Sequence, residues 1–146
     1  MNTPRRILIL NGPNLNLLGR REPGIYGSAT MDDVLAAVRG EFPAAEIYYE
    51  QHNGEDALID ALQQAAFGPS RVDGVVLNAG GYTHTSVALA DAVAAIDIPV
   101  IEVHISNVHA REAFRRQSYL SPVCSGTISG LGTRCYALAV RALIDA

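Results

Sequence analysis

The chain of 146 residues contains no lysine and no tryptophan, and it has two cysteines, Cys124 and Cys135. Without lysine, the protein has no side chain that could form an imine with a carbonyl substrate. The two cysteines form neither a CxxC pair nor a metal-binding pattern, so we expect reduced structural thiols in a cytoplasmic protein. All the basic side chains are arginines, which stay charged at any working pH.

Long apolar runs are also missing, so we expect no membrane-spanning segment and no membrane partner. The apolar run behind Arg5 and Arg6 is too short for a signal peptide. The formal net charge of -4 argues against the concentrated basic surface that a nucleic-acid partner needs. Hydrophobic residues make up 49% of the chain, which indicates one globular domain over residues 1–146.

Apolar strand patterns and helix patterns alternate along the chain. We expect strands at 5–11, 45–51, 73–78, 99–105 and 123–129, and helices at 30–41, 53–67, 85–96 and 132–145. Thr30 with Asp33 fits a capping box, and Asn53 suits the cap of the second helix. This alternation predicts an α/β fold in which a parallel sheet is covered by helices on both faces. Right-handed crossovers leave few topologies, and we expect a flavodoxin-like doubly wound sheet of strand order 2-1-3-4-5.

The segment after the first strand is long, polar and rich in Asn, Gly and Pro, and it contains Arg21 and Tyr26. Loops of this length are typically lids or binding loops, and we expect a lid over about residues 19–27. In open parallel sheets, ligands bind beyond the carboxyl ends of the strands, at the switch point between strands 1 and 3. Residues 11–27, 78–84 and 102–107 meet at that edge, and no comparable polar cluster falls on the opposite edge.

Glu102 and His104 alternate in the fourth strand, so their side chains point to one face of the sheet. Burying these two polar side chains in an apolar strand costs free energy of folding, so we expect them to be paired with each other or to have a function. His84, near a helix start, can be a site residue or a plain surface histidine. The four histidines of the chain show no metal-binding pattern, and we expect no metal and no other cofactor.

Several motifs, taken together and in order, resemble the type II 3-dehydroquinate dehydratases over nearly the whole chain. They are Asn11–Gly19, Arg20–Pro23 with Tyr26–Gly27, Leu77–Ser86, Asp91, Glu102–Asn107 and Arg111–Pro122. The resemblance implies the reversible anti elimination of water from 3-dehydroquinate, which gives 3-dehydroshikimate through an enolate without metal or imine. This step belongs to the shikimate pathway of aromatic amino-acid biosynthesis or to quinate breakdown.

The resemblance also implies catalytic roles. Tyr26 matches the base that removes a proton next to the ketone, and Arg21 matches its activating group. A free tyrosine has a pKa of about 10, but a nearby guanidinium favours the phenolate. Asn14 matches the residue that holds an enolate-stabilising water. His104 matches the general acid that protonates the departing hydroxyl, with Glu102 orienting it.

Further residues match substrate-binding positions of the family. The backbone N–H groups of Ile105 and Ser106 match the site of the substrate carboxylate. Asp91 matches a residue that reaches the site of a neighbouring subunit, which implies a trimer-based homo-oligomer, typically a dodecamer. The remaining substrate-binding positions are Asn78, Gly80, Gly81, His84, Arg111 and Arg115.

Two other interpretations stay open at this point. A flavodoxin-like module could bind a nucleotide or flavin phosphate at residues 11–14, although that segment has neither a GK[ST] nor a GxGxxG pattern. A non-catalytic homologue could retain every required side chain. Flavin absorbance of the purified protein distinguishes the first, and an activity assay distinguishes the second. The helical-looking segment with Arg111, Arg115 and Arg116 can likewise be no more than a solvated face.

Overall fold

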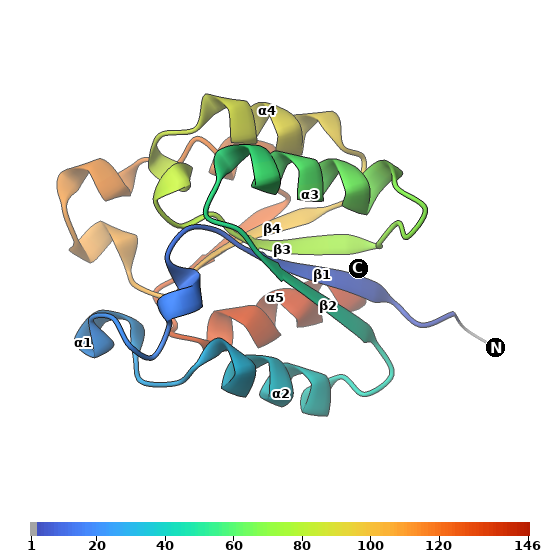
Figure 1. Cartoon of the computed structure of the whole chain (residues 1–146), viewed down its shortest axis with the longest axis horizontal. Helices are drawn as coiled ribbons and strands as arrows, with labels where there is room; N and C mark the ends of the chain where they lie inside the picture. The colour runs from blue at the N-terminus through green and yellow to red at the C-terminus, as the bar shows by residue number, and fades with distance from the viewer. Residues whose placement is uncertain (1–2) are drawn as a thin grey trace.

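The computed structural model describes residues 3–146 and contains one parallel sheet of five strands (Figure 1). Its strands are β1 (Arg6–Asn11), β2 (Glu46–Gln51), β3 (Gly74–Asn78), β4 (Val100–His104) and β5 (Gly126–Ser129). They are ordered β2-β1-β3-β4-β5 and all neighbouring pairs are parallel. This is the predicted flavodoxin-like order.

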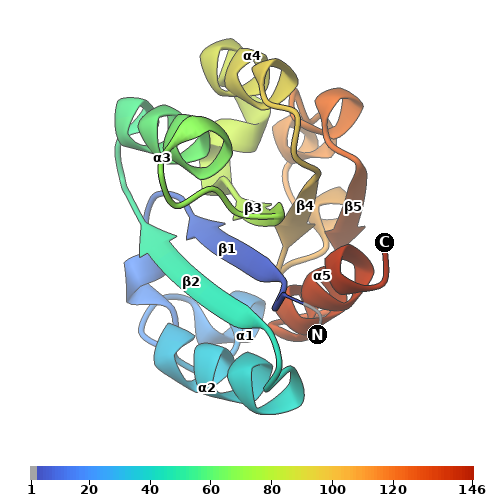
Figure 2. The same ribbon diagram turned by 90° about the vertical axis from the view of Figure 1, so that its right-hand side faces the viewer.

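Helices cover both faces of the sheet, as Figures 1 and 2 show. On one face lie α2 (Met31–Glu41) and α5 (Arg134–Ile144), and on the other lie α3 (Glu55–Phe67) and α4 (Val87–Ala95). Alternate residues of β1 supply the two cores: Ile7 belongs to the core with α2 and α5, and Leu8 to the core with α3 and α4. A strand buried on both faces has to be apolar throughout, which explains the uninterrupted apolar run in the sequence.

Local capping signals explain two of the helix starts. Thr30 Oγ1 accepts the Asp33 N–H at 3.2 Å, and Asp33 accepts the Thr30 N–H at 3.0 Å, so the predicted capping box is confirmed. The predicted Asn53 cap is wrong, because α3 begins after Gly54 with no side-chain cap. Asn53 Oδ1 instead accepts the Asn14 N–H at 3.1 Å, a tertiary contact that uses the acceptor a cap needs.

The segment between β1 and α2 is less irregular than its composition indicates. It contains a 3₁₀ turn at Leu15–Leu17 and a single helical turn, α1 (Pro23–Tyr26), which is visible in Figure 1. Pro23 stands at the start of that turn, where its fixed φ angle and missing N–H fit a helix. The last strand is also shorter than predicted: Ser121–Val123 forms a 3₁₀ turn, and β5 begins at Gly126.

Within residues 3–146, no helix has the length and apolar character needed to cross a membrane. Cys124 and Cys135 are both free thiols. Burial raises the pKa of each thiol to about 12, and the negative charge of Glu102 adds to the effect at Cys124. Both cysteines are therefore neutral thiols; Cys135 is buried and Cys124 is half-buried.

Candidate active site

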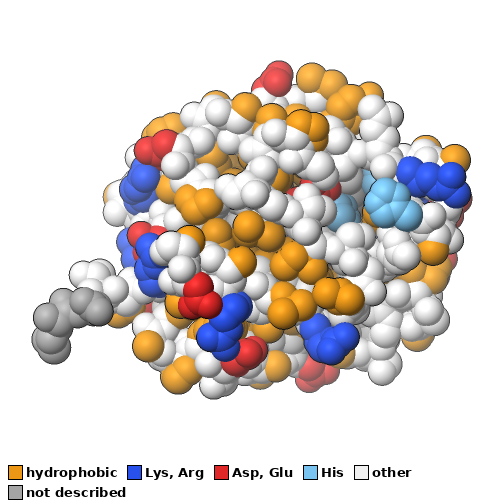
Figure 3. Space-filling view, turned by 180° about the vertical axis from the view of Figure 1, so that it is seen from behind, with side chains coloured by type: hydrophobic (Ala, Val, Ile, Leu, Met, Phe, Trp, Pro, Cys, Tyr) orange, Lys and Arg blue, Asp and Glu red, His pale blue; other side chains and the backbone are white. Residues whose placement is uncertain are grey.

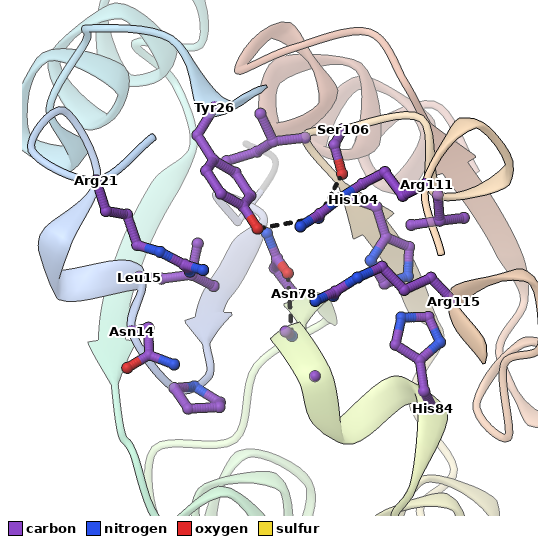
Figure 4. Close-up of a pocket in the computed structure, with 15 residues that line it drawn as sticks. Asn14, Leu15, Arg21, Tyr26, Asn78, His84, His104, Ser106, Arg111 and Arg115 are labelled. Atoms are coloured by element: carbon purple, nitrogen blue, oxygen red, sulfur yellow. Dashed lines mark hydrogen bonds between the residues drawn. The ribbon is translucent and has the colours of Figure 1, made fainter. Parts of the chain in front are cut away.

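A pocket opens where the carboxyl ends of β1, β3 and β4 meet, the place predicted from the strand order (Figure 4). It encloses about 130 Å³, which suits a small polar molecule. The predicted site residues that line it are Asn14, Arg21, Tyr26, Asn78, Gly80, Gly81, His84, His104, Ile105, Ser106, Arg111 and Arg115. Figure 3 shows histidine side chains reaching the surface beside a basic group.

Tyr26 is held over the pocket by two guanidinium groups. Its phenol oxygen accepts a hydrogen bond from Arg111 Nη1 at 3.0 Å, and the same nitrogen donates to Ser106 Oγ at 3.2 Å (Figure 4). The Arg21 guanidinium lies over the Tyr26 ring, 4.7 Å from its centre, and pairs with Glu22. The family resemblance implies the activating role for Arg21, whereas the guanidinium that donates to the phenol oxygen is that of Arg111.

His104 and Glu102 form a buried pair at the end of β4. The distance from His104 Nε2 to Glu102 Oε2 is 2.5 Å, and the predicted pairing on one face of the strand is confirmed. Burial disfavours the charged carboxylate, but hydrogen bonds from His104, Ser121 and Ser118 outweigh it and lower the pKa of Glu102 to about 2. Glu102 is fully buried, so it lies behind His104 instead of lining the pocket.

His84 lies beside the His104–Glu102 pair. Its ring stacks against His104 with 6.3 Å between ring centres, and its Nδ1 lies 2.7 Å from the backbone oxygen of Gln117. Burial lowers the pKa of His84, the Gln117 carbonyl opposes this, and the positive charges of His104 and Arg115 reinforce it. The neutral form therefore predominates, and with Nδ1–H donating to a carbonyl, Nε2 is free to accept a hydrogen bond.

Asn78, the last residue of β3, is fixed by a chain of buried hydrogen bonds. Its Nδ2 donates to the Tyr136 hydroxyl at 3.0 Å, and its Oδ1 accepts the Gly80 N–H at 3.2 Å. Tyr136 donates in turn to Asn11 Oδ1 at 2.8 Å. Burial raises the pKa of Tyr136, which keeps its hydroxyl protonated. Sequence reasoning did not assign Tyr136 to this region, because nothing local in α5 indicates which strand ends it reaches.

The loops after β1 and β3 approach each other closely at the switch point. The Gly12 N–H donates to the Asn78 carbonyl at 2.7 Å, and a side chain at Gly12 would meet the Ala79 carbonyl oxygen at 2.6 Å. Asn14 has a φ of 70°, a left-handed conformation that asparagine tolerates better than most residues. The Asn-Gly-rich composition of the first loop therefore follows from its geometry.

Two of the predicted site residues do not line the pocket of their own chain: Glu102, which contacts it through His104, and Asp91, which is exposed on α4. Arg116 is exposed as well, so the basic segment is divided between pocket and solvent. Among residues 3–146, no group of three or more His, Cys, Asp or Glu side chains is arranged to hold a metal ion.

The fold and the pocket define a parallel α/β enzyme with a polar site, lined by histidine, tyrosine and arginine side chains, at the switch point of its sheet. The family model described as dehydroquinase class II matches residues 5–144. A 3-dehydroquinate dehydratase of Exiguobacterium sp. is 54% identical over 141 residues, which span 96% of this chain and 94% of that protein. The chain belongs to the class II dehydroquinase family and is a hydro-lyase.

Solved structures agree with this assignment. The crystal structure of type II dehydroquinase from Propionibacterium acnes aligns with a TM-score of 0.91 and 40% identity over 100% of both chains. The type II dehydroquinase from Butyrivibrio crossotus aligns with a TM-score of 0.89 and 42% identity, over 98% of this chain and 99% of that one.

Proposed function

We propose that the protein catalyses the reversible dehydration of 3-dehydroquinate to 3-dehydroshikimate by anti elimination through an enolate, without metal or imine. The observation that carries this proposal is the placement of two proton-transfer groups on different walls of one pocket. Tyr26 with Arg111 comes from one side, and His104 from the end of β4 (Figure 4). Glu102 lies behind His104 and pairs with its Nε2. An elimination needs such a separated base and acid.

Tyr26 acts as the base. The N–H that Arg111 donates to the phenol oxygen stabilises the phenolate relative to the phenol, and the Arg21 guanidinium over the ring adds a second positive charge. The phenolate takes the proton next to the substrate ketone, and the electron pair of that C–H bond moves onto the carbonyl oxygen. The pocket must then stabilise an enolate, and a water held by Asn14 together with the surrounding guanidinium groups supplies this.

His104 completes the reaction as the general acid. Its proton goes to the departing hydroxyl, which leaves as water while the enolate collapses to the conjugated enone. The Glu102 carboxylate, at 2.5 Å, stabilises the imidazolium before the transfer and holds the ring in place after it. After the product leaves, Tyr26 loses its proton to solvent and His104 takes up a proton from solvent, which restores the enzyme.

Substrate orientation falls to the polar groups around the pocket. The substrate carboxylate lies against Ser106 and the backbone N–H groups at Ile105 and Ser106. The ring hydroxyls bind Asn78, the neutral His84 and Arg115, and the absence of side chains at Gly80 and Gly81 lets the ring approach the backbone. Fixing the ring in this way sets the reacting C–H and C–O bonds opposite the base and the acid.

The proposal extends to assembly and location. Asp91 is exposed and outside its own pocket, so it is available to a neighbouring subunit in a trimer-based assembly, which we propose to be a dodecamer. Light scattering coupled to size-exclusion chromatography measures this directly. Two neutral thiols, one buried and one half-buried, fit a cytoplasmic location.

The deciding experiment follows the enone absorbance on 3-dehydroquinate for the wild type and Tyr26→Phe. Removing the base should lower kcat by about 10²–10⁴-fold, while Tyr48→Phe, at an exposed hydroxyl on β2, should leave it unchanged. Activity should also survive a chelator. A Tyr26→Phe enzyme with nearly wild-type kcat refutes the base assignment, and a wild type that binds the substrate without turnover refutes the proposed activity.

A further inference from the structure

The buried carboxylate of Glu102 is surrounded by hydroxyl groups as well as by His104. These hydroxyls come from three parts of the chain: the 3₁₀ turn after β3, the 118–121 segment and β5. The hydroxyl oxygens of Thr83 and Ser118 lie 3.2 Å and 2.8 Å from Glu102 Oε2. Those of Ser121 and Thr127 lie 2.6 Å and 3.5 Å from Glu102 Oε1. His104, the proposed general acid, therefore pairs with a carboxylate that is itself oriented by hydroxyl groups from three segments of the chain.

The two serines can point their protons in one direction only. Ser118 Oγ accepts the backbone N–H groups of Leu120 at 3.1 Å and Ser121 at 3.0 Å, so its own proton is left for Glu102. Ser121 Oγ lies 2.6 Å from Glu102 Oε1, and because a carboxylate oxygen can only accept, the Ser121 proton lies between them. Thr127 Oγ1 has one proton and lies 3.4 Å from Ser121 Oγ and 3.5 Å from Glu102 Oε1, so it donates to one of them at a time. A proton on the Glu102 carboxyl would therefore face groups that already donate.

We propose that Ser118 and Ser121 are positioning residues for the reaction, because their hydroxyls hold Glu102 as an oriented anion. The Glu102 anion keeps a proton on His104 Nε2. His104 Nδ1 is then the nitrogen that transfers a proton to and from the substrate. This inference rests on the general-acid role proposed above for His104. It concerns the serines, which contact Glu102 and not the pocket.

The Glu102 carboxylate accepts several hydrogen bonds at once, and this determines where the proton between Glu102 and His104 lies. Hydrogen bonds to the charged form make Glu102 a weaker base, so the proton between it and His104 stays on the imidazole. When His104 gives up its Nδ1 proton, the Nε2–H bond to Glu102 persists and the ring keeps its orientation for the reverse reaction. Two neutral titratable groups lie next to the pair: His84, stacked on His104, and the Cys124 thiol, whose pKa the charge of Glu102 helps to raise. The charged group nearby is Arg115, which lines the same pocket and whose positive charge lowers the pKa of His84.

The kinetic test uses Ser118→Ala and Ser121→Ala, with Ser70→Ala as the control. Ser70 is an exposed serine before β3, at the other end of the sheet from the pocket. Each test substitution should lower kcat about 5–20-fold with KM within about twofold, because it removes a hydrogen bond to a charged group without touching the substrate. Ser121→Thr should recover most of the loss, since Ser121 is exposed and has room for a methyl group.

Two further measurements separate positioning from a general structural defect. The chain has four histidines, so ¹⁵N-histidine NMR with a His104→Asn variant for assignment can report which imidazole nitrogen of His104 carries the proton. The wild type should show the Nε2–H form in the neutral state, and the serine variants a mixture with the Nδ1–H form. In a Glu102→Gln background, Ser121→Ala should cost less than about twofold, because its effect passes through the carboxylate.

The inference is overturned if the alanine variants keep the wild-type kcat and nitrogen pattern, or if Ser121→Ala costs as much in the Glu102→Gln background as alone. Circular dichroism checks that each variant is folded, and Ser121→Thr carries the test if an alanine variant is not. An inactive wild type with the predicted Nε2–H pattern would refute the dehydratase proposal separately, because the NMR measurement needs no turnover.

Discussion

Tyr136→Phe should destabilise the protein strongly although it removes a single oxygen atom. That hydroxyl donates to Asn11 Oδ1 at 2.8 Å and accepts from Asn78 Nδ2 at 3.0 Å, and all three side chains are buried. Phenylalanine keeps the packing of the ring but leaves one amide oxygen and one amide nitrogen without these partners. At about 1–3 kcal/mol for each of these two unsatisfied buried groups, the free energy of unfolding should fall by about 2–6 kcal/mol.

The same substitution should reach the active site, because Asn78 also accepts the Gly80 N–H and both residues line the pocket. We expect KM to rise several-fold while kcat changes less, since Asn78 binds the ring and transfers no proton. Urea unfolding followed by circular dichroism measures the loss in the free energy of unfolding. It is repeated at several protein concentrations, because association shifts the apparent stability. Tyr48→Phe is the matched control at an exposed hydroxyl. A loss below about 0.5 kcal/mol with an unchanged KM refutes the reasoning, because it would mean that the two amides find other partners.

Three further predictions follow from the site. The pKa of Glu102 falls from 4.5 to about 2 on folding. Its contribution to the free energy of unfolding, on the order of 3 kcal/mol, should therefore be present above pH 4.5 and be lost as the pH falls toward 2. The free energy of unfolding should depend less steeply on acid pH in Glu102→Gln than in the wild type. Gly12→Ala places a Cβ 2.6 Å from the Ala79 carbonyl oxygen, so melting should show a loss of about 1–3 kcal/mol, together with weaker substrate binding. Arg111→Met removes the donor to Tyr26 and should lower kcat at least tenfold, whereas Arg116→Met at an exposed position should match the wild type.

Local signals in the sequence explain much of the fold. The apolar runs predicted the strands because strands buried on both faces of a parallel sheet need them, and the Thr30–Asp33 capping box located the start of α2. Predictions failed where a distant segment changed a local preference. Asn53 had the chemistry of a helix cap, but it binds the Asn14 backbone instead.

The sequence by itself determined that Glu102 and His104 share a face, because side chains two apart on a strand always do. It also determined the edge of the sheet where the site forms, because parallel strands bring their carboxyl ends together. The tertiary structure alone decided that Arg111, 85 residues from Tyr26, donates to the phenol oxygen. It also decided that Tyr136 joins Asn11 to Asn78, and that serine hydroxyls hold Glu102. These contacts join segments far apart in the chain, so they depend on how helices and loops pack against the sheet and leave no local pattern in the sequence.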